Sequence, residues 1–204
     1  MIRNNIVHWI FQNNLVAILG APGMNEKGGY VSFNVSQFGY HIYKAEDGRD
    51  TKFFKPQSYM GYSTAVGHFS GLSSCNNDHI LMGMPRFASS TDGHVGSVVL
   101  VCGFNQNMVI WKQFTGNQIG SGFGYNVIVC DYNGDGKDDI MVAAPFQRNP
   151  VGTADTGAVY IFLGTGNIDI LKSINATLSG DNSPGGRFGT SMVNLGDINA
   201  DGVD

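Results

Sequence analysis

The sequence predicts an all-β fold made of β-propeller blades, each of four antiparallel strands, in a partial, unclosed propeller. Composition is the first indication: charged residues are 14% of the chain, glycines number 29 and aromatic residues are 11%. This balance favours short strands and tight turns over helices. The second indication is an internal repeat of about sixty residues. The third is that no segment keeps the 3.6-residue periodicity of a long helix.

Three glycines mark the repeat. Gly61, Gly124 and Gly189 lie 63 and 65 residues apart, and each follows an apolar residue and stands two places before a Ser or an Asn. An apolar strand ending in proline follows the first two glycines and also occurs earlier in the chain. After each proline comes a strand that begins with glycine and, in the complete units, a fourth strand. The predicted strands are 18–22, 80–85 and 140–145, then 29–33, 96–100 and 157–161, then 108–114 and 168–174.

Four short strands in a unit of about sixty residues are typical of a propeller blade. The chain divides into the end of one blade (1–54), two whole blades (55–118 and 119–182) and the start of a further, truncated blade (183–204). Propellers close with about four to eight blades. We therefore expect an open assembly with exposed blade faces and edge strands.

A nine-residue loop at 131–139 has the oxygen pattern of a calcium site. Side-chain oxygens stand at positions 1, 3, 5 and 9, the backbone carbonyl of Lys137 stands at position 7, and Gly136 allows the sharp turn. The side-chain ligands predicted for Ca²⁺ are Asp131, Asn133, Asp135 and Asp139. The flanks are apolar and β-branched, and position 12 lacks the Glu of an EF-hand, so the loop is predicted to join two strands. The alternative is an Asp/Asn/Gly-rich turn without a metal.

The last residues begin the same pattern again. Asp197, Asn199 and Asp201 repeat positions 1, 3 and 5, and Val203 stands at the carbonyl position. The ninth position would be residue 205, beyond the last residue, so we expect this loop to be incomplete and the chain to be a fragment. Seven of the sixteen acidic residues lie in the two loops, where they would repel one another without a cation.

Several classes of function are not supported by the sequence. No basic run of five or more residues exists, which makes nucleic acid an unfavoured partner. No apolar run reaches the roughly 18 residues of a membrane span. The three cysteines show no CxxC spacing, so they indicate neither a zinc site nor a closed disulfide framework. Without HExxH or GxSxG motifs, the chain is predicted not to be an enzyme.

These motifs together resemble the FG-GAP repeats of integrin α chains. The resemblance is carried by Phe123-Gly124, the loop 131–139, Ala144-Pro145 and the strand 157–162, and Gly20-Ala21-Pro22 repeats the Gly-Ala-Pro element. It extends over nearly the whole chain from about residue 15. By this comparison the chain runs from the end of blade three to the start of blade six of a seven-bladed head.

The resemblance implies a fragment of the ligand-binding head of an integrin α subunit, a cell-adhesion receptor. Such a chain would pair with an integrin β subunit, bind extracellular-matrix or cell-surface ligands, and belong to a membrane-anchored parent at the extracellular face of the plasma membrane. Its calcium loops would lie on the lower face, away from ligand. The alternative is the FG-GAP propeller of a secreted lectin or the non-catalytic domain of a secreted phospholipase.

Other positions of the family pattern carry over unevenly. The stretch 68–78 has lost the calcium pattern, and we expect no ion there. The ligand-contacting positions, which would fall at 24–27 and 55–58, do not match. Five aromatic residues resemble those lining the central channel, where a β subunit would dock, although blade-core packing also explains them: Tyr59, Tyr62, Phe123, Tyr125 and Phe188.

Overall fold

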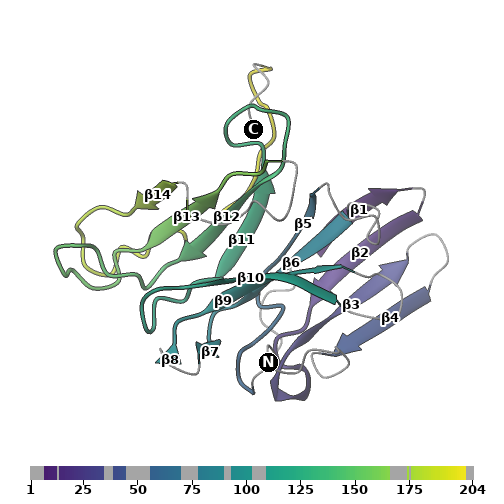
Figure 1. The fold of residues 1–204 in the computed structure, drawn as a ribbon, viewed down its shortest axis with the longest axis horizontal. Helices are drawn as coiled ribbons and strands as arrows, with labels where there is room; N and C mark the ends of the chain where they lie inside the picture. Colours follow the sequence, from purple (N-terminus) through teal and green to yellow (C-terminus); the bar gives the residue numbers. More distant parts are fainter. Residues whose placement is uncertain are drawn as a thin grey trace.

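The computed structural model describes residues 7–12, 14–34, 39–44, 56–69, 78–89, 93–102, 109–165, 174 and 176–200. Three four-stranded antiparallel sheets follow one another along this part of the chain (Figure 1). The one helical element among the described residues is a single 3-10 turn, Met24–Glu26. The predicted all-β class and the open, four-stranded architecture are confirmed.

Each sheet is a meander in which consecutive strands pair. The first contains β1 (Val7–Gln12), β2 (Asn14–Gly20), β3 (Gly29–Asn34) and β4 (Gly39–Lys44). The second contains β5 (Thr64–His68), β6 (Asp78–Met84), β9 (Ser97–Cys102) and β10 (Val109–Thr115), with the small hairpin β7 (Ala88–Ser89) and β8 (Gly93–His94) between β6 and β9. The third contains β11 (Asn126–Cys130), β12 (Asp139–Ala144), β13 (Ala158–Phe162) and β14 (Ala176–Ser179).

The strands differ from the predicted pattern in two places. The sequence predicts only the end of a blade before residue 55, whereas β1 to β4 form a four-stranded sheet there. In the third sheet the fourth strand is β14, which lies after the predicted 168–174, a stretch of which only residue 174 is described. Pairing with β13 sets this position, because Ala158 lies opposite Ser179 and Ile161 opposite Ala176. Residues 183–200 contain no strand, and the unit bounds at 54, 118 and 182 stay predictions.

The core lies between the sheets, because the middle sheet is buried on both faces. Along β6, Ile80 and Met82 pack toward the first sheet, while Leu81 between them packs toward the third. All three side chains are at most 1% exposed. Side chains of a strand alternate between the two faces of its sheet. A strand with another sheet packed on each face therefore has consecutive apolar residues. The sheets therefore stack face to face as blades do.

A turn at a repeated glycine, called here the glycine corner, joins the second and the third sheet to the sheet before it, and a third copy follows β14. Before β11, Phe123 forms a parallel bridge with Gly96, and Met60 and Phe188 form the matching bridges with Gly28 and Gly157. Gly124 has a φ of 89°, a conformation open mainly to glycine. A methyl group on it would collide with the carbonyl oxygen of Ser97 in the preceding sheet. The repeated glycine is therefore required by the close approach of two backbones.

Candidate metal centre

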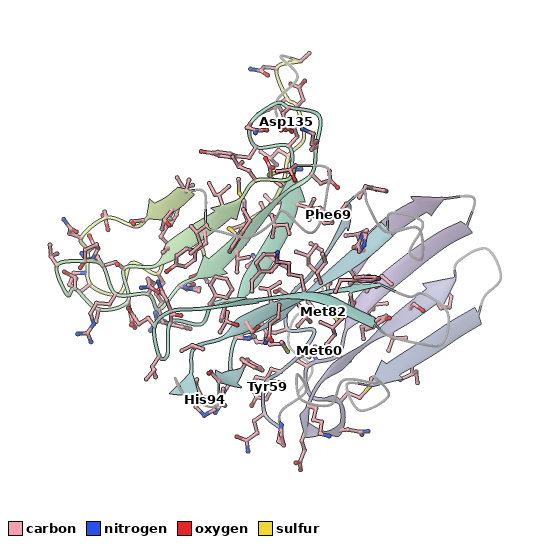
Figure 2. The ribbon with its side chains drawn as sticks, viewed as in Figure 1. Tyr59, Met60, Phe69, Met82, His94 and Asp135 are labelled. Atoms are coloured by element: carbon pink, nitrogen blue, oxygen red, sulfur yellow. The ribbon has the colours of Figure 1, made fainter. Side chains whose placement is uncertain are left out.

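The predicted calcium loop connects β11 to β12 at one end of the third sheet. Asp135 lies near the tip of this loop, at the opposite end of the molecule from Tyr59 and His94 (Figure 2). The loop forms here because β11 and β12 pair in register up to Cys130 opposite Asp139, so the chain must reverse over the residues between them. The prediction of a loop between two neighbouring antiparallel strands is confirmed.

Backbone N–H groups of the loop donate to all four predicted side-chain ligands, beginning with Asp131 and Asn133. Asp131 Oδ1 accepts from the amide of Asp135 at 3.0 Å, and its Oδ2 accepts from Gly136 at 2.7 Å. Asn133 Oδ1 accepts from the Asp135 amide at 3.2 Å. These bonds wind the backbone around its own side-chain oxygens, and Gly136, with a φ of 77°, completes the turn.

Asp135 also interacts with Lys137. Its Oδ1 accepts from the Lys137 amide at 3.0 Å, and its Oδ2 lies 3.3 Å from the Lys137 ammonium. Partial loss of hydration raises the pKa of Asp135, but the hydrogen bonds and charge of Lys137 lower it by more, so the pKa lies below its ordinary value. This carboxylate is therefore ionised at neutral pH and available to a cation.

Asp139 is the buried ligand position. Its side chain is 0% exposed; Oδ1 accepts from the amide of Gly164 at 2.6 Å and Oδ2 from the amide of Tyr132 at 2.9 Å. Burial raises the pKa of Asp139, and repulsion by the carboxylates of Asp135 and Asp131 adds to the rise. A divalent cation in the loop would offset both costs.

The residues of the loop fit Ca²⁺ in chemical kind. All the predicted donors are hard oxygens, and a glycine at the turn lets them face one another around a small circle. In the described part of the chain, however, no three His, Cys, Asp or Glu side chains converge as a preformed metal cluster. The side-chain oxygens of the loop accept hydrogen bonds from the backbone amides given above instead.

The second predicted loop is only partly within the described residues. Asp197 and Asn199 are exposed and lie in a segment without a strand, while Asp201 and Val203 fall outside the described residues. In the stretch 68–78, residues 70–77 also fall outside them. The predictions of a second calcium loop and of no ion at 68–78 therefore stay predictions.

Sequence reasoning gave no role to two residues that hold the loop in place. Gly164, which follows β13, donates its amide to Asp139. Asp138 accepts a hydrogen bond through Oδ2 from the backbone amide of His68, at the end of β5 in the second sheet, at 2.6 Å. Gly164 is 25 residues from Asp139 in the sequence, and His68 is 70 residues from Asp138. No local spacing in the sequence could therefore have identified these two contacts.

Gly164 provides a test of how tightly the loop is supported. A methyl group there would collide with the carbonyl oxygen of Asp138. We expect Gly164→Ala to lower the free energy of unfolding by about 1–3 kcal/mol, the usual cost of overpacking, and to weaken Ca²⁺ binding. Urea denaturation checks the first effect and calorimetric titration the second. Gly23→Ala is the control, because a methyl group on Gly23 meets nothing within 4 Å; equal effects of the two variants would contradict the close support.

The aromatic positions divide between two environments. Phe123 is 1% exposed and packs against Tyr160 with ring centroids 5.4 Å apart, so its role is core packing. Tyr62 and Tyr125, from the corners of neighbouring sheets, are only partly buried and lie with ring centroids 4.9 Å apart. Phe188 is 42% exposed. The tyrosine pair therefore keeps accessible aromatic surface, whereas Phe123 does not.

Comparison with known proteins gives the family. The model of the FG-GAP repeat matches residues 123–162. Integrin alpha-8 of Mus musculus is 38% identical over 153 residues, 72% of this chain and 13% of its own length. Integrin alpha-PS5 of Drosophila melanogaster is 32% identical over 96% of this chain and 19% of its own, and integrin alpha-4 of Xenopus laevis is 30% identical over 93% and 17%.

Fold and repeat together define the chain as a segment of an FG-GAP β-propeller. More particularly, it is homologous to one segment of the integrin α chains, in agreement with the resemblance found in its sequence. The chain spans less than a fifth of the length of each relative named above. In its described part, no helix is long and apolar enough to cross a membrane.

Proposed function

We propose that this chain is part of the ligand-binding head of an integrin α subunit and that the loop 131–139 holds a structural Ca²⁺. The homology over most of the chain supports the first statement. The relatives matched are integrin α chains, which favours this function over a secreted lectin or phospholipase domain and agrees with the prediction that the chain is not an enzyme.

The observation that carries the calcium proposal is the concentration of negative charge at the β11–β12 turn. Burial raises the pKa of Asp139, and the nearby carboxylates of Asp135 and Asp131 add to the rise. With the amide oxygen of Asn133 and the carbonyl of Lys137, these three carboxylates would hold the ion. Bound Ca²⁺ would neutralise the carboxylates and cross-link the turn. Its role would be structural, because the ion would lie within the turn that joins two paired strands of one sheet.

The wider assignments follow from the homology as parts of the same proposal. The parent receptor would present this segment at the extracellular face of the plasma membrane, pair with an integrin β subunit and bind an extracellular-matrix or cell-surface protein. The partly exposed tyrosine pair, Tyr62 and Tyr125, is a candidate contact for the β subunit. Asp197, Asn199, Asp201 and Val203 would contribute to a second calcium loop.

Calcium titration of the chain tests the metal site directly. At a hundredfold excess over its dissociation constant, a bound ion stabilises the fold by about 2.7 kcal/mol. We therefore expect the melting temperature to rise on adding Ca²⁺ and to fall with a chelator. Asp135→Ala should weaken Ca²⁺ binding and reduce this rise, because it removes one of the carboxylates.

Glu26→Ala is the matched control, since Glu26 is an exposed acidic residue outside the loop. The control should bind Ca²⁺ as the unaltered chain does. A melting temperature that is the same in Ca²⁺ and in chelator would eliminate the structural-calcium role.

A further inference from the structure

We propose that Asp138 is a positioning residue that fastens the metal loop to the neighbouring sheet, so that Ca²⁺ in the loop also orders the end of β5. The inference rests on the proposed calcium site. It adds a residue outside the ligand set and an effect of Ca²⁺ binding at the end of β5. It concerns the contact between the second and third sheets at the end that carries the loop.

The connection between the sheets is short and involves a charged acceptor. Asp138 Oδ2 lies 2.6 Å from the backbone nitrogen of His68 and 3.7 Å from its Nδ1. Hydrogen bonds from a backbone N–H to a carboxylate are about twice as strong as neutral ones. His68 is the last residue of β5, and Asp138 immediately precedes β12. The carboxylate therefore connects the end of one sheet with the loop of the next.

The backbone around Asp138 has little room to move independently of the loop. The carbonyl oxygen of Asp138 is so close to Gly164 that a methyl group there would collide with it. Asp139, the next residue, is fixed by the amides of Tyr132 and Gly164. Asp138 thus stands between two proposed ligand positions, Lys137 and Asp139. A cation bound by Lys137 and Asp139 would therefore also restrict the position of the Asp138 carboxylate.

The His68 side of the contact is also closely packed. A methyl group on Gly67 would lie 2.5 Å from the ring of Phe69 and 3.2 Å from a methyl carbon of Val129 in β11. Phe69 is 3% exposed and belongs to the core between the second and third sheets. The end of β5 therefore leads directly into that core, so an ordered His68 amide reports on the contact between the two sheets.

Hydrogen exchange at the His68 amide tests the coupling in the 204-residue chain. In the unaltered chain, we expect Ca²⁺ to slow exchange of this amide about tenfold relative to chelator, the scale of a charge-assisted hydrogen bond. In Asp138→Ala the amide should exchange rapidly in both conditions, while calorimetric titration still shows Ca²⁺ binding. Asp138→Asn is the second variant, for use if the alanine variant fails to fold. It keeps the size and one oxygen of the side chain, so the His68 amide should show intermediate protection.

Asp181→Ala is the matched control, because Asp181 also accepts from a backbone amide, that of Ser183, at 3.0 Å, but within its own loop. It should leave exchange at His68 unchanged. If Ca²⁺ binds and His68 exchange does not respond, or if Asp138→Ala retains full protection, the inference is overturned. If no Ca²⁺ binds at all, the proposed metal site fails instead, and the titration identifies that case separately.

Discussion

Asp139→Ala is expected to lower the free energy of unfolding by about 2–6 kcal/mol, because it leaves two amides without an acceptor at about 1–3 kcal/mol each. The amides are those of Gly164 and Tyr132, and the carboxylate that receives them is 0% exposed. The same change should abolish Ca²⁺ binding, since it removes the ninth ligand position. Urea denaturation in Ca²⁺ and in chelator measures the first effect, and calorimetric titration measures the second.

Asp139→Asn separates the two roles of this residue. The amide side chain retains one acceptor oxygen but carries no charge. Burial raises the pKa of Asp139, so without metal the folded chain holds the proton more tightly than the unfolded chain. Without metal, the contribution of this carboxyl group to stability is greatest below its pKa in the unfolded chain and falls as the pH rises through its higher pKa in the folded chain. Removing the charge should therefore cost less in chelator than in Ca²⁺. Equal cost in both conditions would show that Asp139 supports the turn without serving the ion.

Gly124→Ala is expected to lower the free energy of unfolding by about 1–3 kcal/mol more than Gly120→Ala, the added cost of overpacking. Both glycines have positive φ, 89° and 75°, so both alanine variants strain the backbone. They differ in surroundings: a methyl group on Gly124 would collide with the carbonyl oxygen of Ser97, whereas one on Gly120 meets nothing within 4 Å. The difference between the variants therefore measures the contact between neighbouring sheets.

Urea denaturation of the two variants gives this difference directly. Loss of stability at Gly124 should be accompanied by faster hydrogen exchange in β9, where Ser97 lies. If the two variants are equally stable, the glycine corner serves the local turn alone, and the stacking of sheets does not depend on it.

The oxygen pattern of the metal loop could be predicted because it is local. Asp131 and Asp135 belong to one turn, and their contacts with the backbone reach at most five residues along the chain. The support of the loop could not be predicted in the same way. His68 and Gly164 come to it from another sheet and from another strand end, and only the stacking of sheets brings them there.

The strands show the same division. Predicted strands with proline ends and glycine starts were found in β2, β3, β6, β9, β12 and β13. β1 was missed, because His8 and Gln12 interrupt its apolar pattern and its assignment depends on pairing with β2. β14 lies later than predicted, because its register with β13 selects residues 176–179.

The class of the fold, the repeat and the chemistry available at the β11–β12 turn could be predicted, because each of these depends on residue type and short-range spacing. Tertiary structure alone decided which face of each strand meets which neighbour, why Gly124 must remain glycine, and how Asp138 and Asp139 are held. These features arise where backbones that are distant in sequence approach one another closely in space. The close approach is a property of the stacked sheets and not of any single segment.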